Sequence, residues 1–301
     1  MKKIKTKCLI LIPVGPNTNI SYLDDTLDSV NYYIGNKTTD CYIILLDDTR
    51  DHSLTTSAYF SKENITHIKA KDYSAEKNRS KPVNGPLFGK IITAINSVID
   101  SIEFEVFLKM DTDTLITGYH PHLDAIDFFK DNKNVGILGS YLKKGDGTCK
   151  INGMRLKGNM LKKEISFPYY IRNFKLKLKL SKIMSNAQKF SNYKPGDTVT
   201  GGGYFISYNA LHKLNMNKLL NDDLRFSLVG EDSLFSLLVS SIGFELSDPK
   251  EDNNFMAINW RGLPFPLEEI CAKNKKIIHP VKLEKPEDES NIRAYFKKNR
   301  T

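Results

Sequence analysis

Three apolar runs that contain β-branched residues have the pattern of buried strands: residues 8–14, 40–46 and 104–110. Between the first two, apolar side chains recur at the spacing of one helix face, at Leu23, Leu27 and Val30. Ser21 is the expected N-cap of that helix. A strand, a helix and a strand of these lengths form a right-handed βαβ unit. The pattern therefore predicts an α/β fold on a mostly parallel sheet.

The alternation of strands and helices continues along much of the chain. Further strands are expected at 65–70, 135–140 and 199–207, and further helices at 91–99, 123–129, 209–214 and 234–242. Gly243 is the expected C′ residue of the last of these helices. Between residues 141 and 194 the alternation breaks. Residues 173–180 alternate apolar with basic side chains, the period of a half-buried strand, whereas 180–190 has a helical pattern.

Composition is that of a globular protein, with 40% hydrophobic and 26% charged residues among 301. This length can bury a large core in one domain or in two closely joined ones. No run of eighteen apolar residues occurs, so we expect no membrane-spanning helix. The apolar start of the chain is interrupted by Pro13 and no small-residue cleavage site follows, so it is interpreted as a strand and not as a signal peptide.

The four cysteines are scattered and form no Cys-x-x-Cys pair. Cys8 and Cys41 fall within expected strands, where cysteine acts as a small apolar residue. This usage favours a reducing, cytoplasmic setting.

The positive charge is concentrated in one segment. The net charge is +9, but residues 141–194 hold fourteen Lys and Arg against Asp146 and Glu164, which leaves the rest of the chain near −3. Such asymmetry indicates an acidic partner, either a phosphate-bearing acceptor or an anionic lipid surface. The alternative is a lysine face that is simply solvated.

Two carboxylates, Asp111 and Asp113, follow the strand at 104–110. Ligands of an open α/β sheet bind outside the carboxyl ends of its strands. Two neighbouring carboxylates repel each other unless a cation lies near them, and oxygen ligands suit Mg²⁺ or Mn²⁺. The alternative is a strand end followed by an Asx turn, with Asp113 as a cap.

Other polar residues occupy similar positions. Asp47 and Asp48 end the second strand, where they can accept hydrogen bonds from a ribose or a base edge; a solvated turn is the alternative. Gly89-Lys90 at an expected helix start can direct N–H groups and an ammonium at phosphate, although the glycine spacing is not that of a Walker motif.

Three features in the second half of the chain complete the candidates. The glycines at 201–203 run into a strand and allow a close approach to the backbone or a positive φ. Gly230-Glu231-Asp232 opens a helix, where an acid can cap the helix or take part in catalysis. His279 ends a short apolar strand, a position at which a lone histidine is usually structural. His120 and His122 are expected in a loop, in surface or capping roles.

In their order and spacing these motifs resemble the nucleotide-sugar-dependent glycosyltransferases of the GT-A fold. The resemblance covers most of residues 8–282, and residues 200–207 with Gly230-Glu231-Asp232 are most similar to inverting members, of family 2 or the Fringe-like β1,3-glycosyltransferases. It implies a Rossmann-like, mostly parallel central sheet flanked by helices, with a C-terminal acceptor-binding part.

The resemblance also implies roles for individual residues. Asp111, Asp113 and His279 would hold the metal, Mn²⁺ or Mg²⁺, and Asp232 would be the catalytic base. Residues assigned to the donor UDP-sugar line its nucleoside, diphosphate or sugar: Pro13, Val14, Gly15, Asp47, Asp48, Asp111, Thr112, Gly202, Gly203 and Glu231. Lys90 is added to this set as a phosphate contact, on its own residue pattern.

We therefore expect one GT-A domain over residues 1–301. It would comprise a nucleotide-sugar-binding half (8–140), an acceptor-binding half (141–282) with the basic insert 141–194, and a charged tail (283–301) that is mobile at its end. The insert has no counterpart that can be placed in the family pattern.

The expected function is metal-dependent, inverting transfer from a UDP-sugar to a hydroxyl of a glycan or lipid-linked acceptor. The protein would bind no nucleic acid and act in the cytoplasm, with contact at the inner face of an anionic membrane left open. Two alternatives remain: a retaining enzyme on the same scaffold, and a basic module that binds an anionic polymer.

Overall fold

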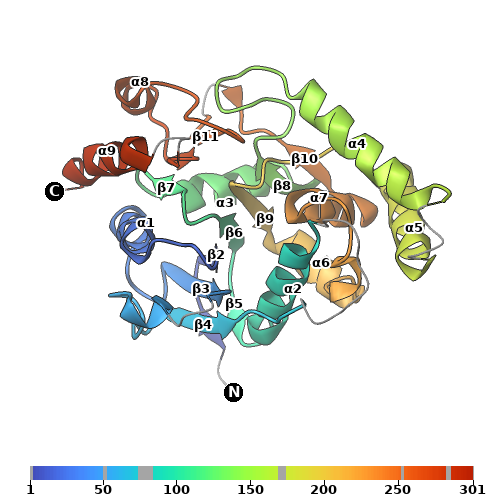
Figure 1. The fold of residues 1–301 in the computed structure, drawn as a ribbon, viewed down its shortest axis with the longest axis horizontal. Coiled ribbons are helices and arrows are strands. Elements are labelled where there is room, and N and C mark those ends of the chain that lie inside the picture. The colour runs from blue at the N-terminus through green and yellow to red at the C-terminus, as the bar shows by residue number, and fades with distance from the viewer. Residues whose placement is uncertain are drawn as a thin grey trace.

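A computed structural model describes residues 3–49, 53–73, 84–168, 174–251, 254–282 and 286–300. A seven-stranded sheet in the order β10-β8-β9-β6-β2-β3-β4 runs through the middle of the molecule (Figure 1). Its strands are β2 (Cys8–Val14), β3 (Cys41–Asp47), β4 (Ile65–Lys69), β6 (Val106–Met110), β8 (Val135–Gly139), β9 (Gly203–Ser207) and β10 (Glu245–Ser247). All neighbouring pairs are parallel except the two that involve β9. The expected α/β class with a mostly parallel central sheet flanked by helices is confirmed.

Helices cover both faces of the sheet, because successive side chains of a strand point to opposite faces. Leu9 and Leu11 of β2 pack into one hydrophobic cluster, whereas Ile10 and Ile12 pack into another. The first cluster contains residues of α2 (Pro86–Val98), α5 (Phe174–Ser191), α6 (Tyr208–Met216) and α7 (Glu231–Ser241); the second contains residues of α1 (Ile20–Tyr33) and α3 (Pro121–Asp131). The buried strands are thus enclosed on both sides, which explains their continuous apolar runs.

A second, three-stranded sheet lies beside the carboxyl end of β6. It has the order β11-β12-β7, with β11 (Met256–Ile258), β12 (Ile277–His279) and β7 (Leu115–Ile116). A third hydrophobic cluster joins this sheet to α8 (Leu267–Ala272) and α9 (Pro286–Lys298). Since β7 follows the strand β6 after a short loop, the small sheet carries C-terminal residues to that loop.

Short elements complete the described chain: β1 (Ile4–Lys5), β5 (Ile102–Glu103), the 3₁₀ helices at Ser53–Thr56 and Asp222–Leu224, and α4 (Ile151–Ile165). None of the helices that can be described over these ranges is both long and apolar enough to cross a bilayer.

The strand expected at 173–180 is wrong, because residues from Phe174 onward belong to α5. Leu176, Leu180, Ile183 and Ala187 are buried on one face of α5, which packs against α7. A seven-residue alternation of apolar and basic side chains fits a strand, but it also places Leu176 and Leu180 on one face of a helix. The helix forms because this face is buried against α7. The basic insert therefore contains two helices, α4 and α5, at the right-hand edge of Figure 1.

Three helix starts also differ from expectation. The N-cap of α1 is Asn19 and not Ser21, since Asn19 Oδ1 accepts a hydrogen bond from the Ser21 amide at 3.0 Å. Helix α2 begins at Pro86, which favours a first-turn position because it needs no N–H partner, so Lys90 lies in the second turn. His122 lies inside α3 and is buried, not in a loop.

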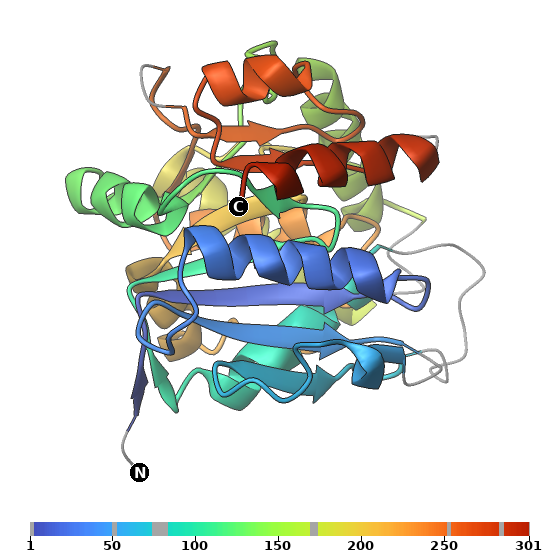
Figure 2. The same ribbon diagram turned by 90° about the vertical axis from the view of Figure 1, so that its left-hand side faces the viewer.

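Residues 286–298 of the charged tail form helix α9. Ile292 and Phe296 of α9 are buried in the third cluster, and Figure 2 shows this helix lying along α1. The segment was expected to be polar because of its high charge, but its few apolar residues lie on one face of α9 and pack in the third cluster. The C′ position of Gly243 is confirmed, with a φ of 88° after the C-cap Ile242.

Candidate functional site

Asp111 and Asp113 lie in the acid loop, residues 111–113, directly after β6. The amide of Asp111 donates to the Gly202 carbonyl at 3.0 Å, and the Thr114 amide donates to the Asp111 carbonyl at 3.1 Å. The Val281 amide donates to the Asp113 carbonyl at 2.9 Å. These backbone bonds tie the acid loop to β9 on one side and to the chain after β12 on the other.

His279 is brought to the acid loop by the pairing of β12 with β7. Its Nε2 lies 3.4 Å from Asp113 Oδ1 and 3.8 Å from Asp111 Oδ2. Its Nδ1 lies 2.8 Å from the Asn259 carbonyl, which fixes the ring and turns Nε2 toward the acids. One ligand atom from each of the three side chains lies within 4.8 Å of the others. The structure therefore brings together the three residues expected to hold a metal.

The pKa values of this group reflect the proximity of the imidazole and the carboxylates. Burial lowers the pKa of His279, but a hydrogen bond to Asp113 and the charges of both aspartates have the larger effect. The net pKa of His279 is therefore above its ordinary value. Burial raises the pKa of Asp113, but the His279 imidazole lowers it more, so the net shift is downward. The cluster thus favours a carboxylate that is ionised.

Gly202 is the residue that makes room for His279. A Cβ on Gly202 would lie 2.0 Å from His279 Nδ1, closer than any two such atoms can approach. A Cβ on Gly203 would make only ordinary contacts, the nearest at 3.5 Å. The close approach that the glycine run predicted is thus required at Gly202, and its partner is the histidine ring.

Lys109 is a residue of this region to which the sequence analysis gave no role. Its side chain is 1% exposed, and its Nζ lies 2.6 Å from Asp111 Oδ1 and 3.0 Å from Glu231 Oε1. It also donates to the Gly201 carbonyl at 2.6 Å. Burial lowers the pKa of Lys109, but the two carboxylates raise it well above its ordinary value. The sequence feature that could have indicated this buried charge is a lysine inside a strand that is otherwise apolar.

Glu231 and Asp232 occupy the first turn of α7, after the N-cap Gly230. Burial raises the pKa of Glu231, and the nearby Asp232 and Asp111 add to this, although Lys109 opposes it. Asp232 Oδ1 accepts a hydrogen bond from the Ser233 amide at 2.7 Å, and its Oδ2 lies 2.5 Å from the Nζ of Lys157 on α4. Asp232 therefore accepts a hydrogen bond from an amide of the first turn of α7, while Glu231 is linked to the acid loop through Lys109.

The residues expected near a nucleoside lie at the carboxyl ends of β2 and β3. The two strands are adjacent and parallel, with Val14 paired to Asp47. Asp47 accepts from Thr49 and pairs with Lys69 at 2.9 Å. Burial raises the pKa of Asp47, and these partners lower it to a net value below the ordinary one.

Asp48 and Lys90, two residues assigned to the nucleotide, are in contact with each other. Lys90 Nζ lies 2.6 Å from Asp48 Oδ2, and the Asp48 amide donates to the Val14 carbonyl at 2.9 Å. Because β2, β3 and β6 run in parallel, this pair and the acid loop share one edge of the sheet. Pro13 and Gly15 flank Val14 at the same strand end.

Two solved structures of low sequence identity are similar to this chain. One is the mannosyltransferase PcManGT from Pyrobaculum calidifontis in complex with GDP-Man and Mn²⁺, at 10% identity and a TM-score of 0.41, over 82% of this chain and 55% of that one. The other is TarS of S. aureus, at 16% identity and a TM-score of 0.43, over 82% of this chain and 35% of that one. The chain thus spans about half the length of the first and about a third of the second. No protein-family model and no curated protein sequence matches it.

Proposed function

We propose that the protein is a metal-dependent, inverting glycosyltransferase that moves a sugar from a UDP-sugar to a hydroxyl of a glycan or lipid-linked acceptor. The observation that carries this proposal is the convergence of Asp111 and Asp113 with His279, which is far from them in the sequence, at the carboxyl edge of the sheet. Glu231, in the first turn of α7, reaches the same region through Lys109, and Asp232 follows it in that turn.

The chemistry of the donor set supports a divalent cation. Mn²⁺ is coordinated by both carboxylates and imidazole, whereas Mg²⁺ prefers the oxygen ligands that the two carboxylates provide. The Nδ1 of His279 is engaged by a backbone carbonyl, as the second nitrogen of a metal-binding histidine usually is. When bound, the cation would act as a Lewis acid toward the leaving diphosphate.

The transfer breaks the bond between the anomeric carbon and the diphosphate oxygen and forms a bond to the acceptor oxygen. In the proposed mechanism Asp232 accepts the proton of the acceptor hydroxyl, and UDP leaves with the electron pair of the broken bond. Lys157 holds the Asp232 carboxylate at 2.5 Å, so this ion pair has to open before Asp232 can act as a base. Lys90, with Asp48, is the proposed contact for the nucleotide.

The test is UDP release from a panel of UDP-sugars with Mn²⁺ present. We expect release, with its loss on chelation of the metal and in Asp113→Asn. Asp127→Asn is a matched control, since Asp127 is an exposed aspartate that pairs with the exposed Lys130 at 2.9 Å. Full activity of Asp113→Asn, or no release with any donor, would refute the proposal.

Asp232→Asn and the anomeric configuration of the product separate the inverting from the retaining reaction. If Asp232 is the base, the amide abolishes transfer while Mn²⁺ binding persists, and product NMR shows inversion. A product that retains the donor configuration would overturn the inverting part of the proposal and leave Asp232 with a structural role, as acceptor for the Ser233 amide in the first turn of α7.

The basic insert supports an acceptor at an anionic membrane surface. Its helices expose apolar side chains, with Ile151 69%, Leu156 63% and Leu178 52% exposed, among exposed lysines of α4 and α5. Such a combination favours binding to anionic lipid by insertion and charge attraction. Sedimentation with phosphatidylcholine vesicles, with and without phosphatidylglycerol, tests this.

We expect binding only to the anionic vesicles, and its loss in Leu156→Glu with Leu178→Glu. The control Met216→Glu, at a 71% exposed methionine of α6, should bind normally. Salt-sensitive binding to oligonucleotides that needs no metal would instead favour the anionic-polymer module.

A further inference from the structure

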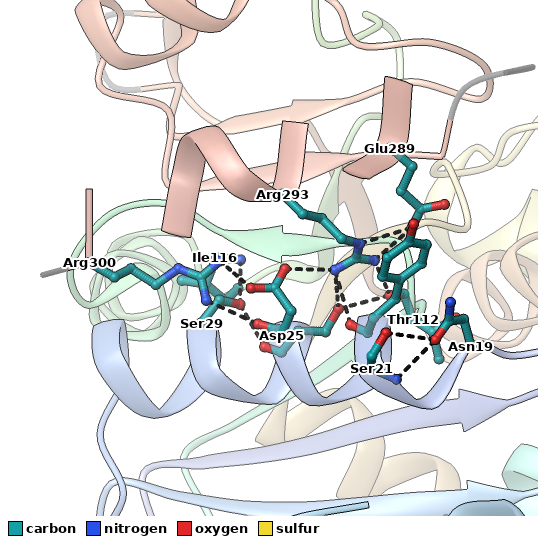
Figure 3. Close-up of polar contacts among 11 residues, drawn as sticks. Asn19, Ser21, Asp25, Ser29, Thr112, Ile116, Glu289, Arg293 and Arg300 are labelled. Carbon is teal, nitrogen blue, oxygen red and sulfur yellow. Dashed lines mark hydrogen bonds and ion pairs between the residues drawn. The ribbon is translucent and has the colours of Figure 1, made fainter. Parts of the chain in front are cut away.

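The C-terminal helix α9 reaches the acid loop through Arg293. Figure 3 shows the guanidinium of Arg293 between helices α9 and α1, beside Thr112, the middle residue of the acid loop. Its Nη2 donates to the Thr112 carbonyl at 3.0 Å. The same carbonyl accepts a hydrogen bond from Thr26 Oγ1 of α1 at 2.8 Å. A side chain nearly three hundred residues into the chain therefore holds the middle residue of the acid loop.

The guanidinium itself is fixed from several directions. Its Nη1 donates to Asp25 Oδ2 at 3.0 Å and to the Tyr22 carbonyl at 3.0 Å, and its Nε donates to Glu289 Oε1 at 2.9 Å. Arg293 is 4% exposed, and Asp25 and Glu289 are each 7% exposed. Two buried carboxylates thus fix the planar fork, so that one of its N–H groups is directed at Thr112.

Arg300 belongs to the same network but does not bond to the acid loop. Its Nη2 donates to Asp25 Oδ1 at 2.8 Å, and its Nη1 donates to the Asp25 carbonyl at 3.1 Å. It is 9% exposed, so it is also a buried arginine paired with the same aspartate. The two arginines therefore share a structural role in docking α9 on α1, and only Arg293 has a bond to the Thr112 carbonyl.

We propose that Arg293 is a positioning residue for the metal site, which holds the acid loop in the orientation that directs Asp111 and Asp113 at a common cation. The proposal rests on the proposed function for the identity of that site. A loop fixed at its middle carbonyl keeps both carboxylates close to the binding geometry, whereas a loose loop must be ordered by the metal at the expense of affinity.

The experiment measures the affinity of the folded protein for Mn²⁺ alone, by calorimetry, in matched arginine variants. We expect Arg293→Gln to bind Mn²⁺ about tenfold more weakly or worse, because outer-shell partners typically contribute 10–100-fold to metal affinity. Arg300→Gln should lose similar stability in urea but keep the wild-type affinity, because the bonds of Arg300 go to Asp25 and not to the acid loop. Arg293→Lys keeps the positive charge but not the planar guanidinium. Compared with Arg293→Gln, it should recover more of the lost stability than of the lost Mn²⁺ affinity.

Thr26→Val is the second variant, in case Arg293→Gln does not fold. It removes the other donor to the Thr112 carbonyl and conserves side-chain volume, so it should weaken Mn²⁺ binding in the same direction. Equal affinities in Arg293→Gln and Arg300→Gln, or an unchanged affinity in Thr26→Val, would overturn the positioning role. Absence of Mn²⁺ binding by the wild-type protein would instead overturn the metal site of the proposed function and this inference with it.

Discussion

Replacing Lys109 with methionine should destabilise the protein by about 3–5 kcal/mol, because it removes one partner from a buried group of charges. The ammonium lies 2.6 Å from Asp111 Oδ1 and 3.0 Å from Glu231 Oε1, and it also bonds to the Gly201 carbonyl. Methionine can fill the space of the lysine stem, but it leaves Glu231, whose side chain is 10% exposed, without its cation. Urea denaturation measures the change as a shift in midpoint at constant m-value.

Two further variants test this reasoning about buried charge. Adding Glu231→Gln to Lys109→Met removes the uncompensated carboxylate, so the double variant should be less destabilised than the sum of the single variants, by about 0.5–3 kcal/mol. Lys130→Met removes an exposed lysine that pairs with Asp127 and should leave stability unchanged. A Lys109→Met protein within about 1 kcal/mol of the wild type would contradict the account, because such a value is typical of ordinary substitutions.

Three other changes give expectations of different kinds. Gly202→Ala puts a Cβ 2.0 Å from His279 Nδ1, so calorimetry should show Mn²⁺ binding weakened about tenfold or more, whereas Gly153→Ala, with open space around the new Cβ, should leave it unchanged. Burial lowers the pKa of His122 to about 4. The unfolded chain then binds a proton more readily than the folded one at this position, so His122 should contribute a loss of about 2 kcal/mol of stability from pH 7 to pH 5, measured in urea as the difference between the wild type and His122→Leu. Phe296→Ala should cost about 3–5 kcal/mol in urea, since Phe296 is 1% exposed; a negligible change would mean that α9 is not docked in solution.

Much of the central sheet could be predicted from the sequence, because its strands carry their own signal. The runs that became β2, β3 and β6 are apolar on both faces, which is the local consequence of helices covering both sides of a parallel sheet. Residues 173–180 lack such an unambiguous signal. A short Leu-Lys alternation fits both the two-residue period of a strand and the 3.6-residue period of a helix, and only packing against α7 selects the helix.

The sequence by itself determined that acids follow buried strands, and therefore which carboxylates could meet at an edge of the sheet. Only the tertiary structure decided what stands around them. Lys109 lies in an otherwise apolar strand and Arg293 in a highly charged tail, and folding buries each beside a carboxylate from a distant part of the chain, Glu231 and Asp25 respectively. The physical reason is that a charge enters the interior only where its partners also lie, and part of each set of partners comes from residues far away in the chain.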